Sequence, residues 1–476
     1  MPPDDHECGW KGYAKQLEER LDQLTAQVEE LKRHRYGRRS EKTAPVAREV
    51  RKERPRTRDE VTAERRAKAE ARDAQVETIT EKLPVPEAER HCPACGNTEL
   101  STVGDGKPTT VYEYVPGYFR RRILLREILK CSCGQLVSAP TPDKSTEKTR
   151  YAPSFIAHVM VQKCVQHVPI YRLEKHFESL GIPVARSTMN DLLHRNAVLL
   201  DPIVQRLIAR IAARELVHAD ETPMKSLATK KRGYVWTFLA DNLVAYVFSE
   251  SRSSETPKRV LGATTGTLVV DAFTGYNAVV QPGNRKRAGC LAHARRKIYA
   301  ARGTTEADDA LAIIRQVYVV EHDAQKAMIV GTGAHLSLRK DKSRALMARL
   351  LCWARRAKRD YGPKSTLGNA ARYVLKNRHA LCAFLFDAKV PVDNNPAERQ
   401  LRRVALGRKN YLFVGDDECG ANIAGIYSLV ATCQLNKVDP QRYLEDVLVR
   451  ISSHPASRID ELLPDKWRPP DAAPPS

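Results

Sequence analysis

Hydrophobic residues recur with a helical period near the N-terminus of this chain. Five aliphatic residues are spaced in alternating steps of four and three: Leu17, Leu21, Leu24, Val28 and Leu31. This heptad spacing gives a helix one apolar seam, so residues 1–35 are expected to form a coiled-coil helix. Two heptads are short for a free-standing coiled coil, and a single helix docked on its own domain is the alternative.

The apolar period stops in residues 36–83. Lys and Arg outnumber Asp and Glu there, and large apolar residues are rare in the first part. A segment of this composition cannot bury a core, so it forms either a flexible linker or a solvated helix. If it is a basic arm, we expect Arg38 and Arg39 to contact DNA phosphates.

Residues 84–140 hold two cysteine pairs with alternating, strand-like stretches between them. The pairs are Cys92-x-x-Cys95 and Cys131-x-Cys133, and a glycine follows each. Four thiolates on two such turns can hold one tetrahedral zinc ion, as in a zinc ribbon. The second pair has one intervening residue instead of two, and four reduced thiols without a metal are the alternative.

Residues 150–205 follow a helical period throughout. One amphipathic helix is predicted over residues 170–180, and a second from residue 186, with Ser187 or a neighbour as its N-cap. The Gly-Ile-Pro-Val break between them gives helix-turn-helix spacing, although a plain helical hairpin has the same pattern. In the DNA-binding interpretation, the second helix would present three residues to DNA: Arg186, Thr188 and Asn190.

The pattern changes to strands in residues 206–300. Two apolar runs each end in an acid, one at Asp220 and one at Asp271, and a hairpin is expected around Asp241-Asn242. Strands of a mixed sheet can hold two carboxylates at one edge, where they repel unless a cation lies between them. Because Mg²⁺ prefers oxygen ligands, Asp220 and Asp271 are predicted to bind a divalent metal.

Polar, Arg-rich helices are predicted over residues 301–390, and a new helix opens within residues 391–452. Its start reads Asp-Asn-Asn-Pro-Ala-Glu, with proline in the first turn. Both Asp393 and Glu398 are candidates for a third acidic ligand, and the pattern does not choose between them. Residues 453–476 are expected to form a C-terminal tail.

The net charge of the chain indicates which kind of molecule it binds. The chain has 79 Lys and Arg against 57 Asp and Glu, a formal net charge of +22, which favours a polyanionic partner. No stretch approaches the ~20 apolar residues that span a bilayer, and the N-terminus lacks an apolar signal segment. We therefore expect a cytoplasmic protein that binds nucleic acid, with no membrane and with its 11 cysteines reduced.

Several motifs together resemble one family, the insertion-sequence-66 transposases of bacteria, of the large TnpC type. The resemblance covers nearly the whole chain. The matching stretches are Tyr36–Lys42, the cysteine pairs, Leu173–Leu193, His218–Pro223, Gly289–Lys297, Asp393–Asn436 and Ile459–Pro464, with Asp393–Arg399 and Ala405–Asn410 the most diagnostic.

This resemblance implies an α/β, multi-domain protein. Its catalytic domain would be an RNase H-like mixed sheet with a helical insertion, preceded by a coiled-coil helix, a zinc ribbon and a helical DNA-binding region. It also implies a DDE transposase that binds transposon ends and uses Mg²⁺ or Mn²⁺ to cleave DNA and transfer strands. The implied catalytic acids and metal ligands are Asp220, Asp271 and Glu398.

The pair Cys290-x-x-His293 resembles a signature found downstream of the second acid in several DDE transposase groups. It would either shape the site and contact DNA or form a buried pair at a strand end. A metal site there needs two more ligands, and none is evident nearby in the sequence. The residues near the acids that we expect to contact DNA are His293, Arg295, Arg296, Arg402, Arg408 and Lys409.

Two other functions remain open at this point: a catalytically inactive zinc-containing DNA-binding protein or repressor, and a structure-specific nuclease of the same fold. For a transposase, the expected partners are double-stranded DNA of the transposon ends and target, and further copies of the chain in a homodimer or synaptic oligomer. Accessory proteins from the same element are also expected partners.

Overall fold

The computed structural model describes residues 58–73, 119, 128–130, 136–138, 149 and 151–469. The chain divides into two compact units, residues 51–121 and the remainder. The predicted coiled-coil helix, Arg38, Arg39 and the four paired cysteines lie outside the described residues. Within the described part of the chain, no helix is both long and apolar enough to cross a membrane.

The basic segment contains a solvated helix, α3 (Arg58–Asp73). Its described side chains are all exposed. Arg66 and Glu70, one turn apart, form an ion pair with an N–O distance of 3.1 Å. Part of the segment predicted as a linker or a solvated helix is therefore helical.

Two short strands flank the second cysteine pair. They are β1 (Ile128–Lys130) and β2 (Leu136–Ser138), which pair antiparallel with Leu129 opposite Val137. The first strand falls where the alternating pattern predicted one.

A mixed sheet forms the centre of the larger unit. Its strand order is β5-β4-β3-β6-β7; β3, β4 and β5 are antiparallel neighbours, whereas β3, β6 and β7 are parallel. The predicted hairpin joins β4 to β5, with Asp241 at a positive φ of 52°. The strands are β3 (Leu216–Ser226), β4 (Arg232–Ala240), β5 (Leu243–Ser249), β6 (Gly266–Val270) and β7 (Arg285–Gly289).

Strand β3 is longer than its apolar run predicted, so Asp220 lies within the strand and not at its end. Only the first part of β3 pairs with β6, as far as His218 opposite Val269. The strand then continues beside β4, with Asp220 opposite Thr237, and a two-residue strand, β8 (Phe413–Val414), pairs with its far end. Asp220 is thus just past the point where β6 ends, which brings it level with Asp271.

Helix α15 (Asp417–Leu435) covers the outer edge of β5. The hydroxyl groups of Ser428 and Thr432 each accept a hydrogen bond from a β5 backbone N–H, at 2.8 Å from Tyr246 and 3.2 Å from Val244. The Thr432 hydroxyl also donates to the Val244 carbonyl at 3.0 Å. An edge strand with satisfied backbone groups cannot recruit another strand, so the sheet ends at this side.

A layer of helices precedes the sheet in sequence: α4 (Pro153–Cys164), α5 (Ile170–Ser179) and α6 (Arg186–Ala212). Helices α5 and α6 occupy the predicted helix-turn-helix positions. The predicted N-cap was wrong, because α6 begins after Ala185 and has no side-chain cap. Helix α6 continues for 27 residues across the predicted boundary at residues 205 and 206, and it packs on β5 and α15.

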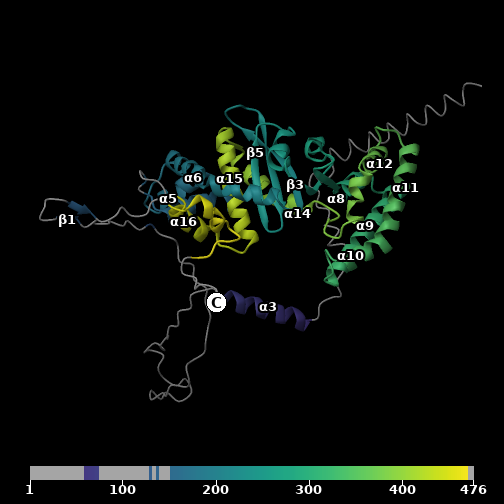
Figure 1. The fold of residues 1–476 in the computed structure, drawn as a ribbon, viewed down its shortest axis with the longest axis horizontal. Helices are drawn as coiled ribbons and strands as arrows, with labels where there is room; N and C mark the ends of the chain where they lie inside the picture. Colours follow the sequence, from purple (N-terminus) through teal and green to yellow (C-terminus); the bar gives the residue numbers. More distant parts are fainter. Residues whose placement is uncertain are drawn as a thin grey trace, which may run out of the picture. The chain divides into compact units, whose positions relative to one another are not determined.

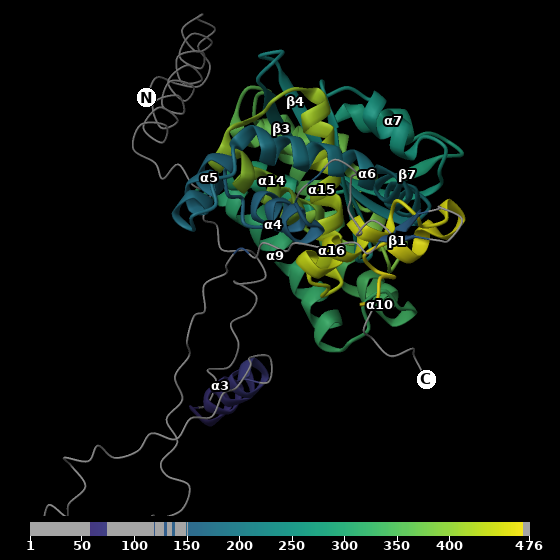
Figure 2. The same cartoon turned by 90° about the vertical axis from the view of Figure 1, so that its left-hand side faces the viewer.

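The chain after α15 returns to this helical layer. Helix α16 (Pro440–Arg450) packs against α4, and η5 (Ala456–Leu462) packs against α6 (Figure 2). Arg210 of α6 pairs with Asp465 at 2.7 Å, and Trp467 is buried. The predicted tail is thus folded onto the core as far as residue 469.

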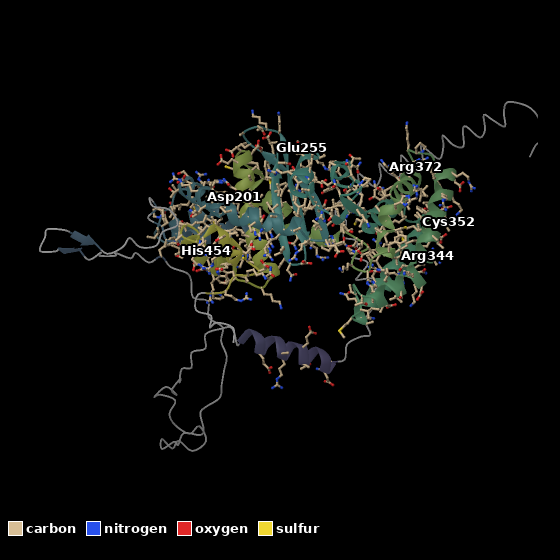
Figure 3. The ribbon with its side chains drawn as sticks, in the orientation of Figure 1. Asp201, Glu255, Arg344, Cys352, Arg372 and His454 are labelled. Atoms are coloured by element: carbon tan, nitrogen blue, oxygen red, sulfur yellow. The ribbon has the colours of Figure 1, made fainter. Side chains whose placement is uncertain are left out.

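The segment between the strands and the last acid is helical, as predicted. Its members share a core that includes Ile314, Leu350 and Trp353 and reaches Val269 of β6. In Figure 1 these green helices lie on the opposite side of the sheet from α6 and α16, and Figure 3 marks Arg344 and Cys352 of α11 among them. The elements are α9 (Thr305–Lys326), α10 (Gly333–Leu338), η3 (Arg339–Ser343), α11 (Arg344–Asp360), α12 (Thr366–Lys376), α13 (Arg378–Leu381) and η4 (Ala383–Leu385).

Three further elements frame the sheet. Helix α8 (Leu291–Tyr299) follows β7 and packs against α9 and α12. Helix α14 (Asn395–Tyr411) packs on β3 and β4. Helix α7 (Glu255–Leu261) packs against the short helix η2 (Thr274–Val279) that follows β6.

Candidate active site

Asp220 is the central acid of the site. Its carboxylate is partly buried and accepts a hydrogen bond from the Glu221 N–H at 2.9 Å. Burial, and after it the charges of Glu221, Asp271 and Glu398, raise the pKa of Asp220 to about 8. Asp220 is therefore close enough to Asp271 and Glu398 for the charges of both to act on it.

Asp271 follows directly after β6 and turns the chain away from the sheet. Its Oδ1 accepts a hydrogen bond from the Phe273 N–H at 2.9 Å, which holds one carboxylate oxygen against the turn. The position after a parallel strand puts Asp271 at the same edge of the sheet as Asp220, as the sequence predicted.

Glu398 reaches the site from the first turn of α14. Its Oε2 lies 3.3 Å from a guanidinium nitrogen of Arg296, on α8. Its Oε1 is shielded from solvent and has no hydrogen-bond partner among the described residues. The nearest ring nitrogen to that oxygen is His293 Nδ1, at 3.5 Å, and burial lowers the pKa of His293 despite the nearby Glu398 charge.

Asn394 fastens the start of α14 to the strand that carries Asp220. It is fully buried. Its amide donates to the Ala219 carbonyl at 2.8 Å, and its Oδ1 lies 2.9 Å from Nδ1 of His218. His218 is buried against this amide.

Asp393, the sequence rival of Glu398, is engaged on both oxygens. Oδ1 accepts the Asn395 N–H at 3.0 Å, and Oδ2 accepts the Tyr318 hydroxyl at 2.8 Å and the Asn395 side-chain amide at 2.7 Å. The residue is also buried. This environment favours Glu398 over Asp393 as the acid that is open to a ligand.

A further acid beside Asp220 on β3, Glu221, was not singled out from the sequence. Its side chain is 1% exposed and accepts hydrogen bonds from the Tyr276 hydroxyl at 2.6 Å and from Arg252 Nε at 2.7 Å. The Arg252 guanidinium in turn lies 4.0 Å from the centre of the Phe273 ring. Only the Asp-Glu pair in a predicted strand could have signalled it, because Arg252 and Tyr276 come from separate segments.

Glu398 lies close to Cys290 and His293, for which no further ligand was evident nearby in the sequence. One ligand atom from each of the three lies within 4.8 Å of the others. Cys290 is the N-cap residue of α8, and it is buried. Burial raises the pKa of its thiol to about 12.

The predicted DNA contacts fall into two separate groups. In the group on α8 and α14, Arg296, Arg402 and Lys409 are exposed, while His293 and Arg295 are partly buried. Arg408 donates to the Thr222 hydroxyl at 3.1 Å, which ties α14 to β3.

The other group lies at the start of α6. Arg186 and Asn190 are exposed there, and Thr188 is partly buried. Arg186 pairs with Glu174 of α5, with an N–O distance of 2.9 Å. The structure does not bring these α6 residues together with the acids.

The side chains fit a bound divalent cation. Burial first, and then the charges of Glu221, Asp271 and Glu398, raise the pKa of Asp220. One Glu398 oxygen is shielded and has no donor among the described residues. A cation would relieve the repulsion and satisfy that oxygen. All of these ligands are oxygen atoms, which suits Mg²⁺ or Mn²⁺.

Comparison with known proteins identifies the family of the chain. Residues 148–422 match the family described as Transposase IS66 family, and residues 428–464 match the IS66 C-terminal element. The uncharacterized protein y4hP of Sinorhizobium fredii is 29% identical over 497 residues, which cover 94% of this chain and 89% of the relative. The uncharacterized protein y4jD of the same organism is 31% identical over 410 residues, covering 80% and 79%.

The family match spans more than half of the chain, including the mixed sheet, the helical segment and the first turn of α14. DDE transposases are polynucleotidyl transferases that bind DNA and use a divalent metal. The chain belongs to the IS66 family of DDE transposases.

Proposed function

We propose that the chain cleaves the ends of its insertion sequence and joins them to target DNA, with Asp220, Asp271 and Glu398 as the catalytic acids. The observation that carries this proposal is geometric: Asp220 and Asp271 stand level at one edge of the sheet, and the Asn394 side chain bonds the start of the Glu398 helix to the strand that carries Asp220. The strand order, with two antiparallel pairings followed by two parallel ones, supports an RNase H-like fold for the catalytic domain.

A different structural element holds each of the three acids in place. Asp220 lies within a sheet strand and Asp271 follows one, so both are held by backbone pairing. Glu398 is on a helix whose start is bonded to β3 through Asn394. When bound at these acids, Mg²⁺ or Mn²⁺ would activate the attacking oxygen and stabilise the leaving oxygen at the phosphate. The side chains would hold that geometry and place the scissile phosphate.

Exposed cations around the acids would hold the DNA backbone. Arg296, Arg402 and Lys409 are exposed, and cationic side chains that contact phosphates position DNA without reading its sequence. Recognition of the transposon end would then come from the start of α6, where Arg186, Thr188 and Asn190 stand in helix-turn-helix spacing.

The N-terminal region would assist this reaction. We assign a structural zinc ion to Cys92, Cys95, Cys131 and Cys133, and a dimerisation role to the heptad helix within residues 1–35. Arg38 and Arg39 would contact phosphates as part of a basic arm. A homodimer or larger synaptic oligomer, with accessory proteins of the same element, would pair two transposon ends.

The test uses the full chain and a duplex that carries a terminal sequence of the insertion sequence. Asp220→Asn, Asp271→Asn and Glu398→Gln should each lower Mg²⁺-dependent strand cleavage by on the order of 100-fold or more. Glu418→Gln is the matched control for Glu398, because Glu418 is an exposed acid in the first turn of α15. Asp241→Asn is the control for the strand acids, since asparagine tolerates the positive φ at that turn.

The same assay separates the alternatives. Cleavage retained in all three acid variants would refute the assignment. A wild-type protein that binds the end but never cuts it, with Mg²⁺ or Mn²⁺, would indicate an inactive DNA-binding protein or repressor. Cleavage without joining to a target duplex would indicate a nuclease of the same fold.

A further inference from the structure

A second cluster of ligand-type side chains adjoins the acids. Cys290 and His293 come from the turn that opens α8, and Glu398 comes from the first turn of α14. One ligand atom of each lies within 4.8 Å of the others. The Cys-x-x-His spacing places the thiol at the N-cap and the imidazole in the first helical turn. The same turn of the chain therefore carries both ligand groups.

The distance between His293 and Glu398 suits a shared metal ion. His293 Nδ1 and Glu398 Oε1 lie 3.5 Å apart. In a tetrahedral zinc site with Zn–N and Zn–O distances of about 2.0–2.1 Å, two such atoms stand about 3.4 Å apart. Both atoms are shielded from solvent and, within the part of the chain that the structure describes, neither has a hydrogen-bond partner. A cation between them would satisfy both.

Cys290 decides which ions would bind. Its Sγ accepts a hydrogen bond from the Asn394 N–H at 3.2 Å, so its lone pairs are already oriented by the backbone. Backbone donors of this kind stabilise a metal-bound thiolate. Sulfur and imidazole ligands select thiophilic ions such as Zn²⁺, whereas Mg²⁺ prefers oxygen. The two neighbouring sites therefore differ in ligand chemistry and share Glu398.

We propose that Cys290, His293 and Glu398 bind a thiophilic divalent ion such as Zn²⁺, and that this ion inhibits DNA cleavage by withdrawing Glu398 from the catalytic acids. Water would complete the tetrahedron, and the Cys290 proton would pass to solvent on binding. The inhibition rests on the proposed catalytic role of Glu398. The metal site itself stands independently of that role.

Binding is tested by Co²⁺ titration of the metal-free full chain, in a background with Cys92→Ser and Cys95→Ser so that the predicted zinc ribbon does not contribute. The expected result is a thiolate-to-cobalt charge-transfer band that Cys290→Ser abolishes. Cys352→Ser is the matched control, because Cys352 is exposed on α11 and should leave the band unchanged. His293→Gln should weaken Co²⁺ binding, and it serves if Cys290→Ser does not fold. Equal spectra for the Cys290 and Cys352 variants would overturn the site.

Inhibition is tested by adding Zn²⁺ at constant Mg²⁺ in the same cysteine-substituted background. Strand cleavage by this parent protein and by its Cys352→Ser derivative should fall at least about tenfold, in line with loss of one metal ligand. The Cys290→Ser derivative should cleave at the same rate with added Zn²⁺ as it does without Zn²⁺. A cobalt band without zinc inhibition would overturn the shared role of Glu398. Absence of cleavage without zinc would count against the proposed function, and the spectrum alone would then decide the metal site.

Discussion

Asn394 Oδ1 lies 2.9 Å from Nδ1 of His218, and this contact joins the start of α14 to the strand that carries Asp220. The imidazole donates, because the amide nitrogen of Asn394 is already donating to the Ala219 carbonyl. The Asn394 carbonyl accepts the Glu398 N–H at 3.2 Å, which begins the helix. Asn394 thus joins β3, which carries Asp220, to α14, which carries Glu398, and both acids are proposed metal ligands.

Asn394→Ala should weaken both folding and metal binding. Loss of the amide leaves the Ala219 carbonyl and the His218 ring without their partner, so the free energy of unfolding should fall by about 1–3 kcal/mol. The Mg²⁺ concentration needed for half-maximal cleavage should rise, because α14 is held less firmly. The control is Asn410→Ala, an exposed asparagine on the same helix. An Asn394 variant that is destabilised but has unchanged Mg²⁺ dependence would show that the residue has only a structural role.

The stability of the metal-free protein should depend on pH through Asp220. Its pKa is raised from 3.8 in the unfolded chain to about 8 in the folded protein, mainly by burial. Between these values the folded state holds a proton that the unfolded state has lost, so the free energy of unfolding should fall as pH rises. The stabilisation is fully present below pH 3.8 and is lost as pH passes about 8.

Urea unfolding in EDTA, at several pH values, measures this effect. Other buried groups also titrate, so the relevant quantity is the difference between wild type and Asp220→Asn. That difference should shift in favour of the variant as pH rises, and saturating Mg²⁺ should remove much of the shift because it binds the ionised carboxylate. Parallel pH profiles for the two proteins would contradict the prediction.

The Glu221→Gln variant should show whether Glu221 stabilises the fold or binds the metal ion. Glu221 is bonded to Tyr276 and Arg252, so the variant exchanges a buried charged partner for a neutral one. The thermal midpoint should fall, while the Mg²⁺ affinity should change by no more than about threefold, since neutral glutamine still fills the space. Asp220→Asn is the comparison, and it should abolish Mg²⁺ binding. Equal loss of Mg²⁺ binding in both variants, measured by calorimetry, would make Glu221 a ligand.

The four N-terminal cysteines should hold about one tightly bound zinc per chain. Elemental analysis after extensive dialysis should find this zinc in the wild type and in Cys290→Ser, and should find it lost in a variant with Cys92→Ser and Cys95→Ser. A chelator that removes the ion should destabilise the N-terminal region, because metal binding and folding are coupled in small zinc domains. Wild-type protein without zinc, and with stability unaffected by chelator, would argue for four reduced thiols.

Local patterns determined much of the fold. The hairpin around Asp241, the helix that begins at Asn395 and the strand before Asp271 follow from turn residues, proline placement and apolar runs, which act over a few residues. The same patterns predicted Asp220 and Asp271 as partners, because acids that follow or lie in adjacent parallel strands share one edge of a sheet.

Only the tertiary structure decided which side chains surround those acids. Glu398 and Asp393 are five positions apart on one segment, and their roles differ because Tyr318 and Asn395 occupy the Asp393 oxygens. Cys290 and His293 lie close to Glu398, because the start of α8 and the first turn of α14 come together in the folded chain. Such contacts join segments far apart in sequence, and their geometry depends on packing that no local pattern encodes.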